Sequence, residues 1–127
     1  MKRIILDTNF TMIPAQFKLD IYSEIERICD FKYKIYVLDK TIYELKKIIK
    51  EQKGKHKRSA SLALQLLKAK KISIIKTKSE KLVDDILVDI AKKSDYIATQ
   101  DLALKIRIKK KKANIITMRQ KKFLKII

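Results

Sequence analysis

The stretch RIILDTNFT, residues 3–11, places a carboxylate directly after a buried strand. Residues 4–6 (Ile-Ile-Leu) form a short branched apolar run, which is typical of a strand covered on both faces. Asp7, Thr8 and Asn9 follow at once. In open α/β sheets, ligands bind beyond the carboxyl ends of the strands. A strand that ends in polar side chains therefore indicates a site at that edge.

Four more segments of β-branched and apolar residues predict strands farther along the chain, at residues 34–38, 72–76, 95–98 and 114–118. Apolar residues recur at helical spacing in five segments between or beside them, at residues 17–28, 42–49, 62–67, 81–93 and 101–112. Strands that alternate with helices are typical of a parallel sheet covered on both faces. We therefore predict an α/β fold, a Rossmann-like three-layer α/β/α sandwich around a parallel sheet of about five strands.

The composition indicates one soluble domain. At 127 residues, 46% hydrophobic and 36% charged, the chain can bury one core, and no repeat or linker divides residues 1–127. The one obvious flexible loop is expected at residues 50–59, KEQKGKHKRS. No apolar run reaches the roughly 20 residues that cross a membrane, and no signal-peptide core precedes Asp7. The single cysteine, Cys29, allows no internal disulfide, so we expect a cytoplasmic protein without a membrane partner.

The chain is strongly basic, with 32 Lys and Arg residues against 14 Asp and Glu residues and a formal net charge of +18. Such a charge attracts nucleic acid, although the excess of Lys over Arg, 27 against 5, is also what AT-rich codons produce. We expect nucleic-acid contacts from basic residues of the predicted loop and of the C-terminal segment: Lys55, Lys57, Arg58, Lys105 and Arg119. The basic tail is either a binding arm around the last strand or ordinary lysine-rich surface.

Carboxylates accompany every predicted crossing from strand to helix except the last. Asp7 follows the first strand, Glu44 lies in the first turns of the helix after the second, and Asp101 follows the fourth. Asp84 and Asp85 open the helix after the third strand. Because the carboxyl ends of parallel strands meet at one edge of the sheet, we predict that these acids converge there.

Each acid also has a purely structural interpretation, because Asp and Glu are favoured in the first turn of any helix. Asp84, Asp85 and Asp101 each fit a helix cap. Asp7 fits one less well, because a loop containing Pro14 is expected to follow it.

A helical wheel of residues 81–93 distinguishes the acids of this segment. Asp84 lies at the edge of the apolar arc, whereas Asp85 and Asp89 point away from it. We therefore prefer Asp84 as the third member of the site, with Asp85 as a second contributor. Asp89 is expected to be a surface acid that pairs with Lys92 or Lys93.

Several carboxylates in one pocket repel one another, which raises their pKa values unless a cation offsets the charge. Oxygen ligands without His or Cys are typical of Mg²⁺ or Mn²⁺. His56 is the only histidine, which excludes a zinc site and a Ser-His-Asp triad, and the single Gly excludes a Gly-rich phosphate loop. We therefore predict a divalent-metal site that acts on phosphodiesters.

These residues resemble the signature blocks of PIN-domain nucleases over the whole chain. The matching segments are ILDTNF around Asp7, the lone Glu44, DDILVDIA from Asp84 and IATQDLALK around Asp101. Within that family, the segments DTNFTMIPAQFKLDIYSEIERI, GKHKRSASLALQLL and IITMRQKKFLKI are more similar to the archaeal branch related to small-subunit ribosomal RNA processing nucleases than to VapC-type toxins. One departure is Gln100, where family members often carry Asn.

The resemblance implies a metal-dependent endoribonuclease that uses an activated water, leaves 5′-phosphate and 3′-hydroxyl ends, and processes ribosomal RNA or its precursor. The implied Mg²⁺ or Mn²⁺ ligands are Asp7, Glu44, Asp84 and Asp101, with Asp85 assisting. Hydrogen bonds from Asn9 and Thr99 would orient these carboxylates. A homodimer is left open.

Other classes fit less well. A haloacid-dehalogenase-type phosphatase has a second Asp where Asn9 stands, and a response-regulator receiver has its acid pair after the first strand, not at residues 84–85. A VapC-type toxin and a non-catalytic RNA-binding factor of ribosome assembly stay as alternatives. Asp7→Asn would separate a nuclease, which loses cleavage and keeps RNA binding, from a scaffold, which loses nothing.

Overall fold

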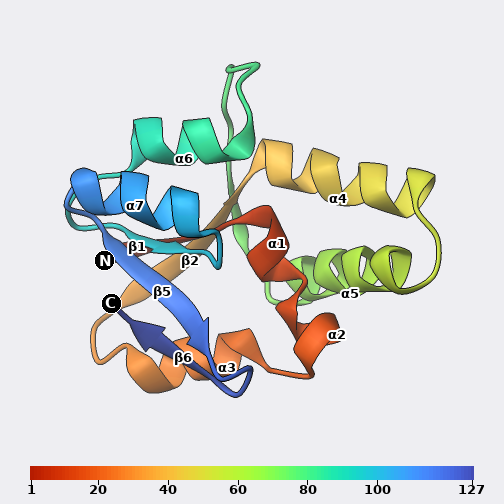
Figure 1. The fold of residues 1–127 in the computed structure, drawn as a ribbon, viewed down its shortest axis with the longest axis horizontal. Coiled ribbons are helices and arrows are strands. Elements are labelled where there is room, and N and C mark those ends of the chain that lie inside the picture. The colour runs from red at the N-terminus through yellow and green to blue at the C-terminus, as the bar shows by residue number, and fades with distance from the viewer.

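Five parallel strands and one antiparallel strand form a single sheet in the computed structural model, which describes residues 1–127 (Figure 1). The strands are β1 (Lys2–Leu6), β2 (Tyr33–Leu38), β3 (Ser73–Ile75), β4 (Tyr96–Ala98), β5 (Asn114–Arg119) and β6 (Phe123–Ile126). Their order is β3-β2-β1-β4-β5-β6, and only β6 runs antiparallel to its neighbour. The first strand thus lies inside the sheet, between β2 and β4.

Seven helices surround this sheet: α1 (Thr8–Thr11), α2 (Ile13–Phe17), α3 (Ile21–Ile28), α4 (Asp39–Glu51), α5 (Lys55–Ala69), α6 (Val83–Ile90) and α7 (Leu102–Lys110). The side chains of β1 alternate between two cores, as the period of a strand requires. Ile4 and Leu6 pack with residues of α3, α4 and α5, whereas Ile5 packs with α6 and α7. The predicted three-layer α/β sandwich is confirmed.

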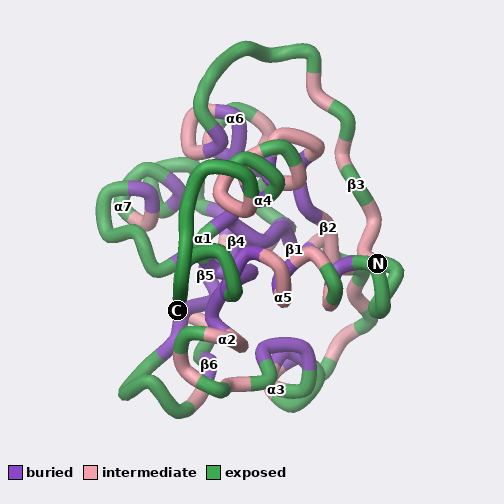
Figure 2. Tube along the Cα trace, turned by 90° about the vertical axis from the view of Figure 1, so that its right-hand side faces the viewer, coloured by how far each residue is buried: buried purple, intermediate pink, exposed green.

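The strands run through the buried centre of the molecule, and the segment between β3 and α6 lies largely exposed at its edge (Figure 2). A buried ion pair joins β1 to the start of β4. Asp95, 2% exposed, accepts hydrogen bonds from Arg3 Nε at 3.0 Å and Nη2 at 2.7 Å. Burial alone would raise the pKa of Asp95, but the bonds from Arg3 hold it below its usual value. No helix has the length and apolar character needed to span a membrane.

The segment after β1 is helical, where a loop was predicted. Asp7 is the N-cap of α1, and its Oδ1 accepts a hydrogen bond from the Thr8 backbone N–H at 2.8 Å. Pro14 lies in the first turn of α2, where the missing N–H costs nothing. The view that Asp7 is a poor cap is therefore wrong, because the same carboxylate caps a helix and faces the predicted site.

The predicted flexible loop at residues 50–59 is also wrong. Helix α4 continues to Glu51 and α5 begins at Lys55, so only residues 52–54 connect them. Gly54 adopts a positive φ of 66° at the N-cap of α5, a conformation that favours glycine. The Lys and Arg residues that suggested a loop are good helix formers.

Two smaller expectations are corrected as well. Asp89 is a surface acid as predicted, but its partner is Lys81, at 2.8 Å, and not Lys92 or Lys93. The C-terminal segment forms a sixth strand, β6, which pairs with β5 through a tight hairpin.

Candidate active site

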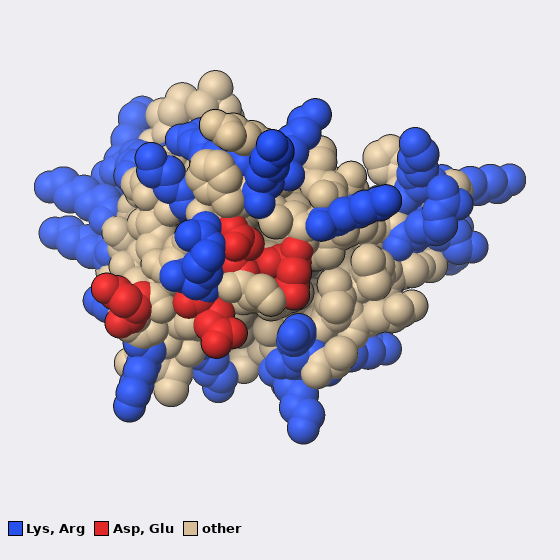
Figure 3. All heavy atoms as spheres, turned by 90° about the horizontal axis from the view of Figure 1, so that it is seen from below, with Lys and Arg blue, Asp and Glu red and all other residues tan.

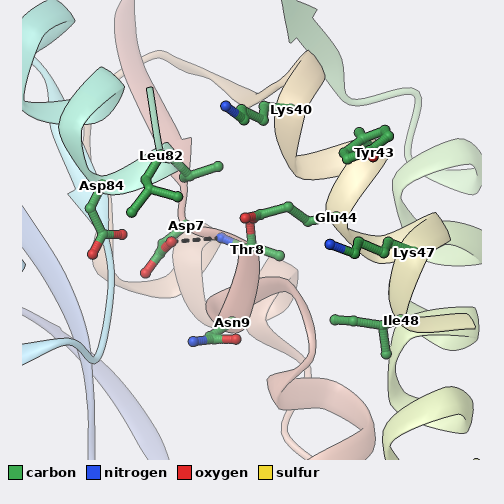
Figure 4. A pocket seen from close by; sticks show the side chains of 11 residues that line it. Asp7, Thr8, Asn9, Lys40, Tyr43, Glu44, Lys47, Ile48, Leu82 and Asp84 are labelled. Atoms are coloured by element: carbon green, nitrogen blue, oxygen red, sulfur yellow. Dashed lines mark hydrogen bonds between the residues drawn. The ribbon is translucent and has the colours of Figure 1, made fainter. Parts of the chain in front are cut away.

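A pocket of about 480 Å³ lies at the carboxyl edge of the sheet, where β1 leads into α1 and where α4 and α6 begin (Figure 4). Three of the predicted carboxylates line it: Asp7, Glu44 and Asp84. They come from three separate segments of the chain. Three of the five predicted acids therefore share one pocket, whereas Asp85 and Asp101 do not line it.

Asp7 is the most buried of these acids, at 5% exposure. Its Oδ1 accepts from the Thr8 N–H, and its Oδ2 accepts from Thr99 Oγ1 at 2.9 Å. Burial nevertheless raises the pKa of Asp7 to about 6, and the negative charges of Asp84 and Asp101 raise it further against the two hydrogen bonds. The pocket therefore opposes the charge on this carboxylate.

Asp84 also has a raised pKa, and Asp101 contributes to it. Burial and then the charge of Asp101 raise the pKa of Asp84, which is half-buried and accepts no hydrogen bond. Asp101 is the N-cap of α7, and its Oδ1 accepts from the Leu104 N–H at 3.0 Å. The Asp101 N–H donates to Thr99 Oγ1 at 3.0 Å, so Thr99 links the segment of Asp101 to Asp7.

Glu44 is held by a residue that the sequence analysis missed. Thr8 Oγ1 donates to Glu44 Oε1 at 2.5 Å, and it lies 3.0 Å from Thr41 Oγ1. Since the Thr8 hydroxyl proton points to Glu44, Thr41 is the donor to Thr8. This chain of hydroxyls joins α1 to α4 and fixes the carboxylate over the pocket.

Two residues predicted for the site lie differently. Asp85 points to Arg107 of α7, with 2.9 Å between Oδ1 and Nη1, and does not line the pocket. Asn9 lines the pocket but is exposed, and its side chain forms no hydrogen bond with a carboxylate. Of the two predicted orienting residues, only Thr99 bonds a carboxylate.

Four of the five predicted RNA-binding residues line two other cavities. Lys55 and Arg58 line one with His56, between α2 and the start of α5. Lys105 and Arg119 line the second, along α7 and β5, where burial and then the charge of Arg119 lower the pKa of Lys105. Lys57 is exposed beside the first cavity and lines neither. The basic groups of the carboxylate pocket itself are Lys40 and Lys47, which the sequence analysis did not name.

Gln100, the departure from the family pattern, has a clear structural role. Its Oε1 accepts from Thr117 Oγ1 at 2.8 Å and from the Met118 N–H, and its Nε2 donates to the Met118 carbonyl at 3.2 Å. The long amide therefore ties the residue before Asp101 to the carboxyl end of β5.

The donor set fits a hard divalent cation. The pocket offers carboxylate oxygens and no His or Cys, and neighbouring negative charges help to raise the pKa of Asp7 and of Asp84, an effect that an added positive charge would oppose. As placed, no three of these side chains come close enough together to surround one ion. The fit therefore rests on the chemistry of the donors and on their mutual repulsion.

Comparison with known proteins identifies the family. The family model of a PIN-like domain matches residues 4–121. The chain belongs to the PIN-like domain family. This PIN-like chain is 30% identical over 130 residues to Ribonuclease VapC4 of Methanocaldococcus jannaschii, an alignment that covers 99% of this chain and 97% of that protein. The family resemblance seen in the sequence blocks is thus confirmed.

The three-dimensional comparison agrees. The PIN-like chain is similar to the PIN domain endonuclease Utp24, with a TM-score of 0.80 and 23% sequence identity, over 98% of this chain and 90% of that one. At this identity the likeness concerns the fold.

Proposed function

We propose that this protein is a metal-dependent endoribonuclease whose site is the carboxylate pocket. One observation carries the proposal. Asp7, Glu44 and Asp84 come from three segments of the chain and line one pocket, and the negative charges of Asp84 and Asp101 raise the pKa of Asp7. A purely structural role for these acids would not require such repulsion.

The four acids would hold Mg²⁺ or Mn²⁺. When bound, such an ion acidifies water and offsets the charge that develops on a phosphodiester. Thr8 and Thr99 hold Glu44 and Asp7 in fixed orientations, which lowers the cost of arranging the site. Asp84 accepts no hydrogen bond, so both of its oxygens are free for the ion or for water.

RNA is the proposed substrate. The matched relative is named a ribonuclease, and the charge of +18 favours a polyanion. The face that carries α3 is less suited to RNA, because acidic side chains gather in its centre among the Lys and Arg residues (Figure 3). The acids on and beside α3 are Asp20, Glu24, Glu26 and Asp30. The two basic cavities and the carboxylate pocket are the better candidates for an RNA path.

Cleavage of a labelled single-stranded RNA tests the proposal. We expect wild type to cut it with Mn²⁺ or Mg²⁺ and not with EDTA. Asp84→Asn should lower the rate at least 100-fold while RNA binding persists, because the lost carboxylate makes few structural contacts. Asp89→Asn is the matched control: it removes an exposed acid of the same helix and should leave the rate within twofold. Cleavage that survives both EDTA and Asp84→Asn would contradict the proposal.

Ribosomal RNA processing is the proposed cellular role, supported by the sequence blocks. The similarity to Ribonuclease VapC4 favours a toxin as a second candidate. Expression of wild type and Asp7→Asn in growing cells distinguishes them. A toxin arrests growth only in the wild-type form, whereas a processing enzyme supports growth and its Asp7→Asn variant leads to accumulation of ribosomal RNA precursor. A scaffold would behave identically in both forms.

A further inference from the structure

One face of α4 lines the carboxylate pocket and does not pack into the core. Lys40, Tyr43, Glu44 and Lys47 stand at positions i, i+3, i+4 and i+7, the spacing that places side chains on one face of a helix. All four line the carboxylate pocket, while Leu45 points into the core. Tyr43 is 63% exposed at this pocket, although burial of so large an aromatic side chain normally stabilises a fold.

A second exposed apolar side chain stands across from Tyr43. Leu82, the residue before α6, is 69% exposed and lines the same pocket, on the side of Asp84 (Figure 4). The chain before Leu82 is held in place, because Lys40 Nζ donates to the carbonyls of Glu80, at 2.9 Å, and of Lys81. The pocket therefore has an aromatic wall, Tyr43 on α4, and across from it an aliphatic wall, Leu82, on the side of Asp84.

We propose that Tyr43 and Leu82 hold one unpaired nucleobase of the RNA between them. A base has two apolar faces, and stacking on protein side chains is strong and independent of sequence. In a duplex each base is stacked on its neighbours and is not available to such a clamp. This inference rests on RNA being the substrate of the carboxylate pocket.

The charges around the two walls suit a nucleotide rather than an apolar peptide. Lys47, one turn after Tyr43, is exposed and forms no salt bridge, so its ammonium group is free for a phosphate. A pocket of about 480 Å³ lies within the range of sites that hold small ligands, about 300–1,000 Å³. One base with its phosphate would occupy the space between the walls and bring the backbone to the acids.

A binding cycle between side chain and base tests the clamp. All proteins carry Asp7→Asn, so that the RNA stays intact, and affinity for a short labelled single strand is measured by fluorescence anisotropy. The strand is compared with a series in which each nucleotide in turn is abasic. Tyr43→Ala and Leu82→Ala are the test variants, and Tyr43→Phe keeps the ring. Ile74→Ala, at a 52% exposed residue of β3 outside the pocket, is the matched control.

We expect Tyr43→Ala and Leu82→Ala each to weaken binding about 5- to 100-fold, and Tyr43→Phe and Ile74→Ala by less than about twofold. Removing the base at one position of the strand should weaken binding to the Asp7→Asn protein by the same factor as Tyr43→Ala does. Removing that base should not weaken binding further when the protein already carries Tyr43→Ala. Additive losses at every position, or no measurable RNA binding, overturn the clamp. This test measures binding and not cleavage, so its outcome is independent of the cleavage assay. If Tyr43 and one base prove to be coupled but the wild-type protein does not cut RNA, the clamp is supported and the nuclease proposal is contradicted. If the wild-type protein cuts RNA but no coupling is found, the nuclease proposal is supported and the clamp is contradicted.

Discussion

At the scale of single residues, the buried carboxylate of Asp7 lowers the stability of the fold that positions it. Its two oxygens are satisfied by Thr8 and Thr99, yet its pKa lies near 6 because the carboxylate is buried beside other acids. Ionisation of Asp7 therefore destabilises the metal-free protein. A cation in the pocket would remove that penalty, so stability and metal binding are linked at this residue.

Asp7→Asn should make the metal-free protein more stable at pH 8. The folded-state pKa of Asp7 is raised above its usual 3.8, so its destabilising effect is absent below about pH 4 and grows until about pH 6. The full effect of such a shift is about 3 kcal/mol. Because the amide accepts one hydrogen bond fewer, we expect a gain of about 1–3 kcal/mol in the free energy of unfolding.

Urea denaturation in EDTA at pH 4 and pH 8 measures this effect. The difference between Asp7→Asn and wild type should be present at pH 8 and nearly absent at pH 4. Asp89→Asn serves as the charge-matched control and should not stabilise, because Lys81 lowers the pKa of Asp89. Equal or lower stability of Asp7→Asn at pH 8 would show that the carboxylate is not strained.

The sequence analysis predicted three acids that line the pocket, Asp7, Glu44 and Asp84, and also Thr99, which bonds Asp7, but it missed the role of Thr8. Asp7, Asp84 and Asp101 each follow or open a predicted element, so the topology alone brings them to one edge. The wheel favoured Asp84 over Asp85, and the structure places Asp84 in the pocket and Asp85 on Arg107. The bond from Thr8 to Glu44 could not be predicted, because it depends on α1 being a helix.

At the scale of elements, the first turn of α4 holds the segment that leads to α6. Asp39 Oδ2 accepts from the Thr77 N–H at 3.0 Å, and its Oδ1 accepts from Thr77 Oγ1 at 2.9 Å. The bond from the Thr77 N–H is the main cause of the lowered pKa of Asp39. Lys40 holds the same segment nearer to Leu82. Two adjacent residues of α4 thus set the position of the aliphatic wall.

Asp39→Ala should loosen this segment without unfolding the protein. We expect amide hydrogen exchange at Thr77 to accelerate at least tenfold, and the KM for single-stranded RNA to rise about three- to tenfold because Leu82 is less well placed. Asp30→Ala, at an exposed acid that accepts no side-chain hydrogen bond, is the control for the change in charge. Unchanged exchange at Thr77 would mean that Lys40 alone holds the segment.

The sequence analysis missed β6 and the first part of α5 for physical reasons. The hairpin from β5 to β6 turns at Gln120 and Lys121, both with positive φ, whereas such turns normally carry Asn or Gly. The buried face of α5 consists largely of small residues, which give a weak apolar pattern. The five parallel strands were predictable because each contains a short run of β-branched and other apolar residues, which is typical of the strands of a parallel sheet.

At the scale of the whole molecule, charge is arranged around the site and not spread evenly. Besides the carboxylate pocket, the protein has two cavities lined by cations: one begins at Leu102, next to Asp101, and the other lies between α2 and the start of α5. The α3 face carries acids instead (Figure 3). An RNA strand that passes from one cavity through the pocket to the other would meet cations on both sides of the acids.

The salt dependence of RNA binding tests this path. Each cation that contacts a phosphate of a single strand adds about 0.7 to the slope of log K against log salt. We expect two double variants, each made in the Asp7→Asn background, to reduce the steepness of this slope by about 1.4. They are Lys55→Ala with Arg58→Ala, and Lys105→Ala with Arg119→Ala. The two pairs lie in separate cavities, so their effects should add. The control pair, Lys2→Ala with Lys32→Ala, removes the same charge at the opposite, amino end of β1, where Lys2 N–H bonds the Lys32 carbonyl, and should leave the slope unchanged. If removal of a pair changes the slope no more than this control does, that pair does not contact the RNA strand. The strand would then leave the pocket only through the other cavity.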